Sequence, residues 1–302
     1  MRRASALCLV VVAASLLLGA KDEAARTEQL WKSPQDISSR DLFHGQGGKA
    51  SVPPDVVYRF QSEDKKGHSG GYEVLDPEGR EWDVKTGEEA QSELVVSRIL
   101  GALGYHQPVM HYVERWRMSG GPTDTPPPGR FRLESDHETK GDWKWRDNPF
   151  VGTKPLRGLV VVNLLLNNWD LATSQNRIYE VPEKAPGPRR RYVVQDIGGS
   201  LGRSRMVLGT RNVLEDFERE GFIERVTRSG HVRFDFHGRH WKLRNELTAE
   251  DVVWACRLLS KLSHRQLDDA FRAAGYPEDH RRRYVAKIEE KIQQGLALEG
   301  KQ

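Results

Sequence analysis

The chain has 302 residues, of which 37% are hydrophobic and 30% are charged. This length suits one two-lobed domain or two small ones, and it allows a sizeable buried core. A formal net charge of +4 is too balanced to indicate nucleic acid as a partner. The composition also excludes a fibrous or wholly disordered chain.

The N-terminus has the pattern of a secretory signal peptide over residues 1–20. Arg2 and Arg3 precede an apolar run that ends in small residues before Lys21. The pattern predicts export to a periplasm or to the outside of the cell. The alternative is an uncleaved membrane anchor, although the run is shorter than the about 20 residues of a typical span. Only Cys256 follows the predicted signal, so no internal disulfide is expected.

The next segments predict a peripheral arm followed by a β-rich lobe. Residues 21–55 are polar and mixed, and their glycine-rich stretch 41–48 is expected to be a turn. Residues 56–147 are typical of a mostly β lobe with one helix. The expected strands are 56–60, 72–75, 81–85, 110–118 and two within 131–145, and the expected helix is 88–103.

Residues 148–302 predict a larger helical lobe. An apolar helix is expected over 155–168. Thr248 with Asp251, and Ser263 with Gln266, have the spacing of capping boxes that begin two further helices. A last helix is expected near the C-terminus, where apolar residues recur at helical spacing. The predicted fold class is therefore α+β, with a small β-rich lobe and a larger helical one.

Two segments of the second lobe carry candidate chemistry. Asp170 follows the apolar helix on a polar loop, where a carboxylate could orient or deprotonate a hydroxyl group. Asn176 follows six residues later, and Asp196 follows the strand at 192–194 and precedes two glycines. Amide and carboxylate oxygens suit Mg²⁺ or Mn²⁺, so Asn176 and Asp196 are the predicted metal ligands.

The β-rich lobe offers groups that could hold phosphates. Gly67, Gly70 and Gly71 lie between its first two strands, where glycines let backbone N–H groups approach an anion. Lys85 ends the third strand, and Glu89 and Glu93 lie one turn apart on the following helix. Glu93 is the preferred partner of Lys85 because a full helical turn precedes it.

Each of these features also has a purely structural interpretation. The glycines could form an ordinary hairpin loop, Lys85 could be an exposed residue at a strand end, and the two Asp segments could be turns that cap local structure. Three histidines, at 231, 237 and 240, could bind zinc, but no accompanying zinc motif supports that interpretation.

Taken together, the motifs resemble those of the atypical kinase-like group that includes HipA-type kinases, phosphatidylinositol kinases and secretory-pathway protein kinases. The resemblance covers about residues 56–295 and rests on Trp82-Asp83-Val84-Lys85, Glu93, Asn168-Trp169-Asp170, Asn176 and Asp196-Ile197-Gly198. It implies an ATP and metal cofactor, with Lys85 on the nucleotide phosphates, Asp170 as base, and Asn176 and Asp196 on Mg²⁺ or Mn²⁺.

The chain departs from that pattern at three points. The common kinase spacing after Asp170 points to Gln175 instead of Asn176. Leu171-Ala172 stands where the family often has Arg-His, and no Ala-Pro-Glu segment follows Asp196. The expected activity is phosphate transfer to a hydroxyl of a protein or small molecule. The alternatives are a catalytically inactive pseudokinase that acts as a binding module, and an exported scaffold domain with no nucleotide site.

Overall fold

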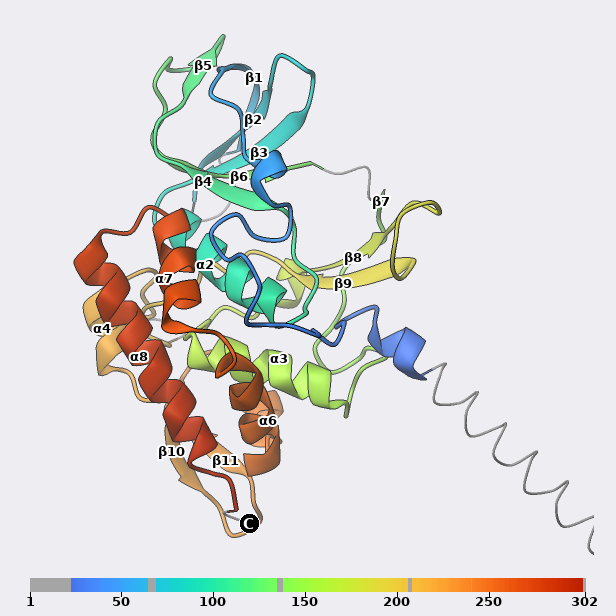
Figure 1. The fold of residues 1–302 in the computed structure, drawn as a ribbon, viewed down its shortest axis with the longest axis vertical. Helices are drawn as coiled ribbons and strands as arrows, with labels where there is room; N and C mark the ends of the chain where they lie inside the picture. The colour runs from blue at the N-terminus through green and yellow to red at the C-terminus, as the bar shows by residue number, and fades with distance from the viewer. Residues whose placement is uncertain (1–22, 65–68, 135–137, 206–207, 240, 301–302) are drawn as a thin grey trace, which may run out of the picture.

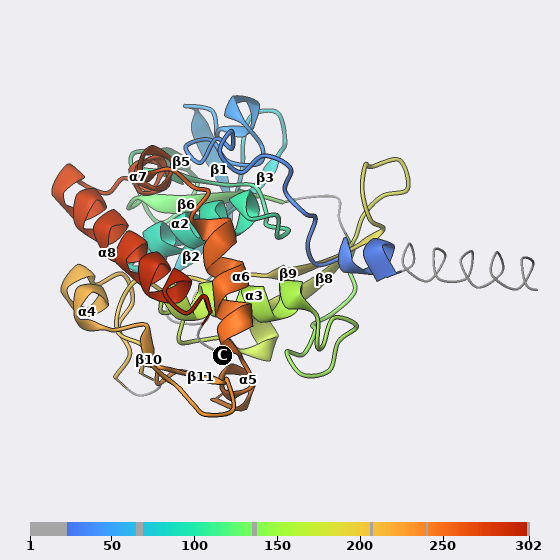
Figure 2. The same cartoon turned by 60° about the horizontal axis from the view of Figure 1, so that its bottom comes forward.

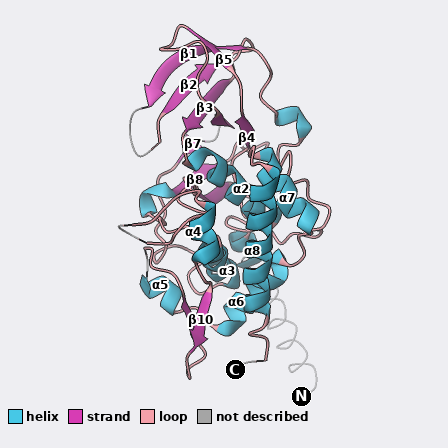
Figure 3. Ribbon diagram, turned by 90° about the vertical axis from the view of Figure 1, so that its left-hand side faces the viewer, coloured by secondary structure: helices cyan, strands magenta, loops and turns pink. Residues whose placement is uncertain are grey.

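The computed structural model describes residues 23–64, 69–134, 138–205, 208–239 and 241–300, and it has the two-lobed α+β architecture expected from the sequence (Figure 1). One lobe is a curled six-stranded sheet with one helix beneath it. The other lobe holds most of the helices, as the side view shows (Figure 3). The predicted signal peptide, residues 1–20, lies outside the described residues.

The sheet of the smaller lobe has the strand order β4-β6-β3-β2-β1-β5. All neighbouring strands are antiparallel except β1 and β5, which are parallel. Helix α2 (Glu89–Ala102) follows β3 directly and contacts β3, β4 and β6. The strands are β1 (Val57–Asp64), β2 (Gly71–Leu75), β3 (Glu81–Thr86), β4 (Met110–Val113), β5 (Arg117–Ser119) and β6 (Gly129–Leu133).

The turn between β2 and β3 shows how the local sequence fixes the register of these strands. Asp76 Oδ1 accepts hydrogen bonds from the backbone N–H groups of Glu78 and Arg80, and Gly79 takes a φ of 81°. Asp76 Oδ2 also accepts from the indole N–H of the buried Trp82 at 3.1 Å. The sequence Asp76-Pro77-Glu78-Gly79 therefore forms a tight turn, and this turn places Trp82 and Lys85 at defined positions of β3.

The larger lobe begins with a helix and a sheet of three short strands, next to the predicted catalytic segments. Helix α3 (Lys154–Leu165) starts at Thr153, whose hydroxyl caps the backbone of Leu156. The 3₁₀ turn η2 (Thr173–Gln175) then leads into β8 (Asn176–Glu180), which pairs with β9 (Arg190–Val194) and with β7 (Glu138–Thr139).

The rest of this lobe is mainly helical. Helix α6 packs against both α3 and α8 (Figure 2). The capping boxes expected at Thr248 and Ser263 are present at the starts of α6 and α7. The remaining elements are α4 (Leu214–Arg219), β10 (Ile223–Val226), β11 (Val232–Phe234), α5 (Trp241–Asn245), α6 (Ala249–Leu259), α7 (His264–Ala273) and α8 (Glu278–Leu296).

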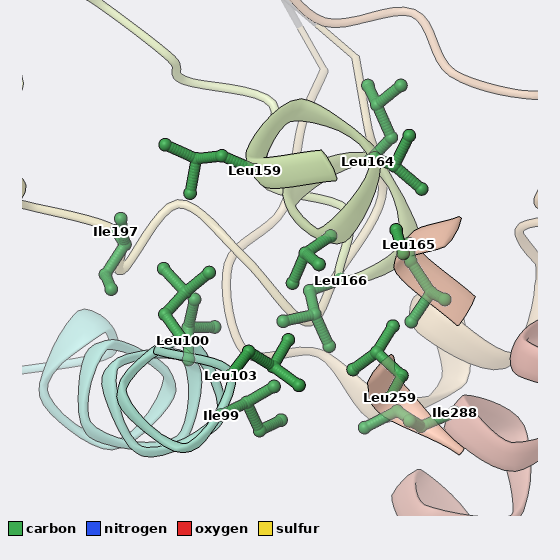
Figure 4. Packing of buried hydrophobic residues seen from close by; sticks show 14 of the residues in the cluster. Ile99, Leu100, Leu103, Leu159, Leu164, Leu165, Leu166, Ile197, Leu259 and Ile288 are labelled. Carbon is green, nitrogen blue, oxygen red and sulfur yellow. The ribbon is translucent and has the colours of Figure 1, made fainter. Parts of the chain in front are cut away.

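The main hydrophobic core joins α2 to the helices of the larger lobe. Figure 4 shows Ile99 and Leu100 of α2, and Leu103 directly after it, near Leu166, which follows the end of α3, with Leu259 and Ile288 close by; all of these are buried. Because one core contains residues from α2 and from the larger lobe, the position of α2 is tied to the larger lobe as well as to the sheet.

The segment 21–55 is not the peripheral arm that its polarity predicted. Leu30, Ile37 and Leu42 are each at most 2% exposed and belong to the main core. The indole N–H of Trp31 donates to the Leu103 carbonyl at 2.8 Å, and Gln266 donates to two carbonyls of the segment. We call residues 23–55 the N-terminal arm; it packs along α2 and α7 because its few apolar residues are spaced to reach that core.

Two expected strands differ from the structure. The strand predicted over 110–118 is divided into β4 and β5, which lie at opposite edges of the sheet. Within 131–145, β6 starts earlier than expected, and the short β7 joins the sheet of the larger lobe instead of the smaller one. Among the described residues, no helix combines the length and apolar composition needed to cross a bilayer.

Candidate active site

A cavity of about 750 Å³ lies between the two lobes and contains much of the predicted site. The sheet and α2 contribute Lys85, Glu89, Glu93, Arg130 and Arg132. The larger lobe contributes Gln175, Arg177, Tyr179 and Asp196. Its walls are therefore strongly polar and carry both signs of charge.

The wall on the sheet side is a buried network of alternating charges. Lys85 Nζ lies 2.8 Å from Glu93 Oε2, so the expected ion pair is present. Arg130 Nε lies 3.3 Å from the other oxygen of Glu93, and a second nitrogen of Arg130 lies 2.6 Å from Asp83. Arg132 lies 2.9 Å from Asp83. Lys85 and Arg130 occupy directly opposed positions on β3 and β6, and Glu93 lies between their charges.

The network shifts the titration of its members. Burial opposes ionisation of Glu93, but Arg130 and Lys85 outweigh it and hold the pKa of this carboxyl below its usual range. Burial also opposes the charge of Lys85, but Glu93 and Asp196 outweigh it and raise the pKa of the ammonium group. Both groups are therefore charged at neutral pH, although the Glu93 side chain is only 1% exposed.

Glu89 connects three segments around the cavity. Its Oε2 accepts a hydrogen bond from the Ser69 hydroxyl at 3.1 Å and lies 3.4 Å from Lys85 Nζ. Its Oε1 lies 2.5 Å from Nε of Arg211, a residue of the segment that follows Asp196. The Arg211 guanidinium also stacks over the ring of Trp169 at 4.6 Å. The choice between Glu89 and Glu93 is thus resolved by geometry: both contact Lys85, and Glu93 is the closer and more buried partner.

The glycine-containing loop joins β1 to β2, but its glycines have individual structural roles. Gly67 lies outside the described residues. The Gly70 carbonyl accepts hydrogen bonds from the backbone and the hydroxyl of Thr86. A Cβ at Gly71 would lie 2.4 Å from the carbonyl oxygen of Val84, so the close pairing of β2 with β3 requires glycine there. Gly70 and Gly71 do not line the cavity, whereas their neighbour Ser69 does.

Asp170 lies on a loop that is fixed from below by buried amides. Asn167 has a φ of 56°, and its side chain donates to the Gly202 carbonyl and accepts from Lys291 Nζ at 2.9 Å. Asn168 donates to Asn163 at 2.9 Å inside the core. Asp170 itself is partly exposed, with Oδ1 2.7 Å from Arg239 Nε and Oδ2 accepting from Gln175 at 3.2 Å.

Asn176 does not lie beside the other predicted site residues. It is the first residue of β8, it is fully buried, and its amide donates to the Trp143 carbonyl at 2.9 Å. The odd-numbered positions from 175 to 179 line the cavity, and Asn176 does not. Because side chains alternate along a strand, Asn176 faces the core and Gln175 is the residue that contacts Asp170. The predicted metal ligand Asn176 therefore does not reach the cavity.

Asp196 follows β9 at the lip of the cavity. It has a φ of 51°, and its half-exposed carboxylate pairs with Lys85. The glycines after it allow close packing: a Cβ at Gly198 would lie 2.5 Å from Glu89 Cβ, and one at Gly199 would lie 3.2 Å from Asp170 Cβ. The Gly199 carbonyl also accepts from the Trp169 N–H at 3.1 Å. Asp196 is thereby held between α2 and the Asp170 loop.

Four residues that contact the candidate site were not predicted from the sequence: Arg130, Arg211, Arg239 and Lys291. The first three are distant in sequence from the acids that they contact, so no local spacing identifies them. Lys291 is completely buried on α8, where it donates to the carbonyl of Leu165 and to Asn167. The sequence did offer one indication of this role: Lys291 lies beside Ile288 and Ile292 on the apolar face of a helix. A lysine on such a face is buried only where polar partners contact it.

The oxygen donors at the site fit a hard divalent cation held jointly with phosphates. Asp196 offers a carboxylate, and the side-chain Oε1 of Gln175 accepts one N–H, from Ala172, which leaves a second lone pair. Mg²⁺ is commonly bound by one or two carboxylates together with substrate phosphates. Within the described part of the chain, no cluster of three or more His, Cys, Asp or Glu residues could hold a metal without such help.

The arrangement defines the class of fold: a curled sheet with a lysine–glutamate pair to α2, above a helical lobe that presents two aspartates, is a two-lobed kinase-like fold. The comparison with solved structures agrees. The chain is similar to the Helicobacter pylori proinflammatory kinase CtkA, with 12% sequence identity and a TM-score of 0.50 over 81% of this chain and 98% of that one. At this identity the likeness concerns the fold. No protein-family model and no curated protein matches the sequence.

Proposed function

We propose that this protein is an exported kinase that binds ATP with Mg²⁺ or Mn²⁺ and transfers a phosphate to a hydroxyl group, with a protein as the acceptor. The observation that carries the proposal is the meeting of Lys85, Glu93 and Asp196 at one cavity between the lobes. Phosphoryl transfer depends mainly on positioning and on stabilising charge, and these groups are of the types that do so.

Each residue has a role that its own contacts support. Lys85 would neutralise nucleotide phosphates, with Glu93 holding it in place. Asp196 and Gln175 would hold the metal, which supplies charge neutralisation between the phosphates. Asp170 would accept the proton of the acceptor hydroxyl, and Arg239, 2.7 Å away, would hold its carboxylate in position. Ser69, in the loop after β1, lines the cavity and would contact the phosphates.

The test measures ATP consumption by the purified chain with Mg²⁺ or Mn²⁺, followed by mass measurement of self-modification. Asp196→Asn is expected to abolish the metal-dependent part of ATP binding, because its carboxylate is the strongest predicted metal ligand. Asp279→Asn, a change of the same kind at an exposed helix start, is the matched control. Equal metal-dependent binding by the parent and Asp196→Asn would contradict the proposed site.

A pseudokinase is the second candidate, and one observation favours it. Asn176 is committed to the core, and Gln175, which stands in its place, already bonds Asp170 and Ala172. Metal-dependent ATP binding without turnover by the parent protein would identify this alternative. Absence of any thermal shift with ATP and metal would instead support a scaffold domain. Export is tested separately by finding whether the protein from its native host begins near Lys21.

A further inference from the structure

A buried arginine without a carboxylate partner lies behind the candidate active site. Arg98, in the second half of α2, is 6% exposed. One of its terminal nitrogens donates to the Met110 carbonyl at 2.7 Å and lies 3.4 Å from His111 Nδ1. Its Nε has no hydrogen-bond acceptor. Among the described residues, Arg98 forms no ion pair.

The environment leaves this positive charge largely uncompensated. Burial lowers the pKa of Arg98 to about 10, and Asp41 offsets this only in part, so the guanidinium is charged at neutral pH. Burial and the nearby Arg98 charge also lower the pKa of His111 to about 4, so His111 is neutral. A buried charge is costly unless another group pairs with it. Arg98 therefore has unused capacity to bind an anion.

Arg98 lines a cavity of about 140 Å³ between α2 and the N-terminal arm. One water needs only about 10–15 Å³ on the same measure, so the cavity has room for a polyatomic ion. Ser97 lies beside Arg98, and Asp41, Gly45 and Gln46 of the arm form the opposite side. Gly45 has a φ of 74°, and a Cβ there would lie 1.5 Å from Arg98 Nη1, so the arm closes on the guanidinium at a position that requires glycine.

Asp41 does not supply the missing counter-charge. Its Oδ1 accepts the backbone N–H groups of Phe43 and His44, and its Oδ2 lies 2.8 Å from His44 Nδ1. The carboxylate is thus committed to the turn of the arm itself. The glycine-rich stretch 41–48 shapes a cavity around a charge and leaves that charge without an ion-pair partner.

We propose that this cavity is a binding site for a small oxyanion, such as phosphate or a carboxylate, with Arg98 as its charged ligand and the Ser97 hydroxyl as a second donor. The site is independent of the proposed kinase activity. It is distinct from the cavity between the lobes, although Gln46, Gln107 and Pro108 contribute to the walls of both. Because α2 also carries Glu89 and Glu93, an anion bound here would contact the helix that forms one wall of the candidate active site.

The test is calorimetric titration of the full chain with inorganic phosphate and, in parallel, with acetate, at constant ionic strength set by potassium chloride. We expect saturable millimolar or tighter binding of at least one of them. Arg98→Gln, which retains a donor for the Met110 carbonyl, should weaken that binding at least about tenfold, because the charged ligand is lost. Lys85→Gln is the matched control for phosphate bound between the lobes, and it should leave binding at the Arg98 site unchanged.

A second variant keeps the proposal falsifiable if Arg98→Gln does not fold. Asp41→Asn removes a negative charge from the cavity wall, while asparagine retains the capacity to form the turn. It should strengthen binding, with the opposite sign to Arg98→Gln. The proposal is overturned if the parent shows no saturable binding of phosphate or acetate, if Lys85→Gln abolishes the binding, or if Asp41→Asn weakens it.

Discussion

The two walls of the cavity between the lobes hold their charges in different ways. On the sheet side, Lys85, Glu93 and Arg130 contact one another inside the protein, and the side chains of Glu93 and Arg130 are at most 2% exposed. On the opposite side, the carboxylates of Asp170 and Asp196 are 22% and 48% exposed. Their loops are held through the backbone, where both Asn167 and Asp196 have a positive φ.

The difference indicates that the two walls have different roles: one is rigid, and the other can exchange ligands. A buried network of opposite charges is rigid, because removing one member leaves the others uncompensated. Partly exposed carboxylates on a fixed backbone stay free to exchange partners. Substitutions of Glu93 and Arg130 in the first wall should therefore affect mainly stability, and substitutions in the second wall mainly ligand binding and turnover.

The largest expected effect is on turnover at the exposed wall. For the proposed kinase, Asp170→Asn should slow phosphate transfer by about 10²–10⁴-fold, the usual contribution of a positioned acid or base. The free energy of unfolding should change by less than about 1 kcal/mol, because the pair with Arg239 is partly exposed. Rate measurements and urea unfolding on the same preparations check both parts, with the exposed Asp147→Asn as control. Turnover equal to that of the parent would remove Asp170 from the mechanism.

At the buried wall, the expected effect is on folding. Glu93→Gln should reduce the free energy of unfolding by about 3–5 kcal/mol, because Lys85 and Arg130 lose the anion between them. Glu134→Gln is the matched control: its carboxylate pairs with Arg132 at 3.3 Å but is exposed, so the loss should stay below about 1 kcal/mol. Equal losses in the two variants, measured by urea unfolding, would show that the two walls do not differ as described.

Lys291 is a buried amine beneath the exposed wall, and its effect on stability should depend on pH. Burial and the nearby Lys287 lower the pKa of Lys291 to about 7, whereas the pKa of a lysine in an unfolded chain is about 10.4. The unfolded chain therefore binds more protons than the folded one between these values, and this lysine makes stability rise with pH across that window. Lys291→Met should remove a rise on the order of a few kcal/mol, while the exposed Lys261→Met should retain it. Unfolding curves at about pH 7, 8 and 9 that keep the parental slope in Lys291→Met would contradict this account.

The smallest effect separates two neighbouring amides. Asn176→Ala should lose about 1–3 kcal/mol of stability, because the Trp143 carbonyl loses its buried donor, and metal-dependent ATP binding should be unchanged. Gln175→Ala should weaken that binding with a loss of stability below about 1 kcal/mol, since its side chain faces the cavity. Titration with ATP at varied Mg²⁺ measures the metal-dependent binding, and thermal unfolding measures the stability. If Asn176→Ala weakened metal-dependent ATP binding and Gln175→Ala did not, Asn176 and not Gln175 would be the metal ligand.

The parts of the site that sequence could predict are those set by local periodicity. Lys85 lies one residue before the end of β3, and Glu93 lies one turn into α2, so their contact follows from the short connection between the two elements. The capping boxes at Thr248 and Ser263 likewise depend on neighbours three residues away.

The parts that sequence could not predict depend on strand register and on long-range packing. Whether Gln175 or Asn176 faces the cavity is decided by the pairing of Asn176 with Val194, and a shift of one residue reverses the faces. Arg130 reaches Glu93 only because β6 lies next to β3, an order that is not sequential along the chain. The burial of the N-terminal arm rests on three scattered apolar residues that show no helical or strand periodicity.

The contact between Lys85 and Asp196 bears on the order in which ligands would enter the site. The ammonium group of Lys85 and a divalent cation compete for the same carboxylate, so a free metal ion must first displace Lys85. Nucleotide phosphates would attract Lys85, and the Asp196 carboxylate would then be available to hold the metal. For the proposed kinase, ATP and metal should therefore enter as one complex, and titration with Mg²⁺ alone should give much weaker binding than titration with ATP present.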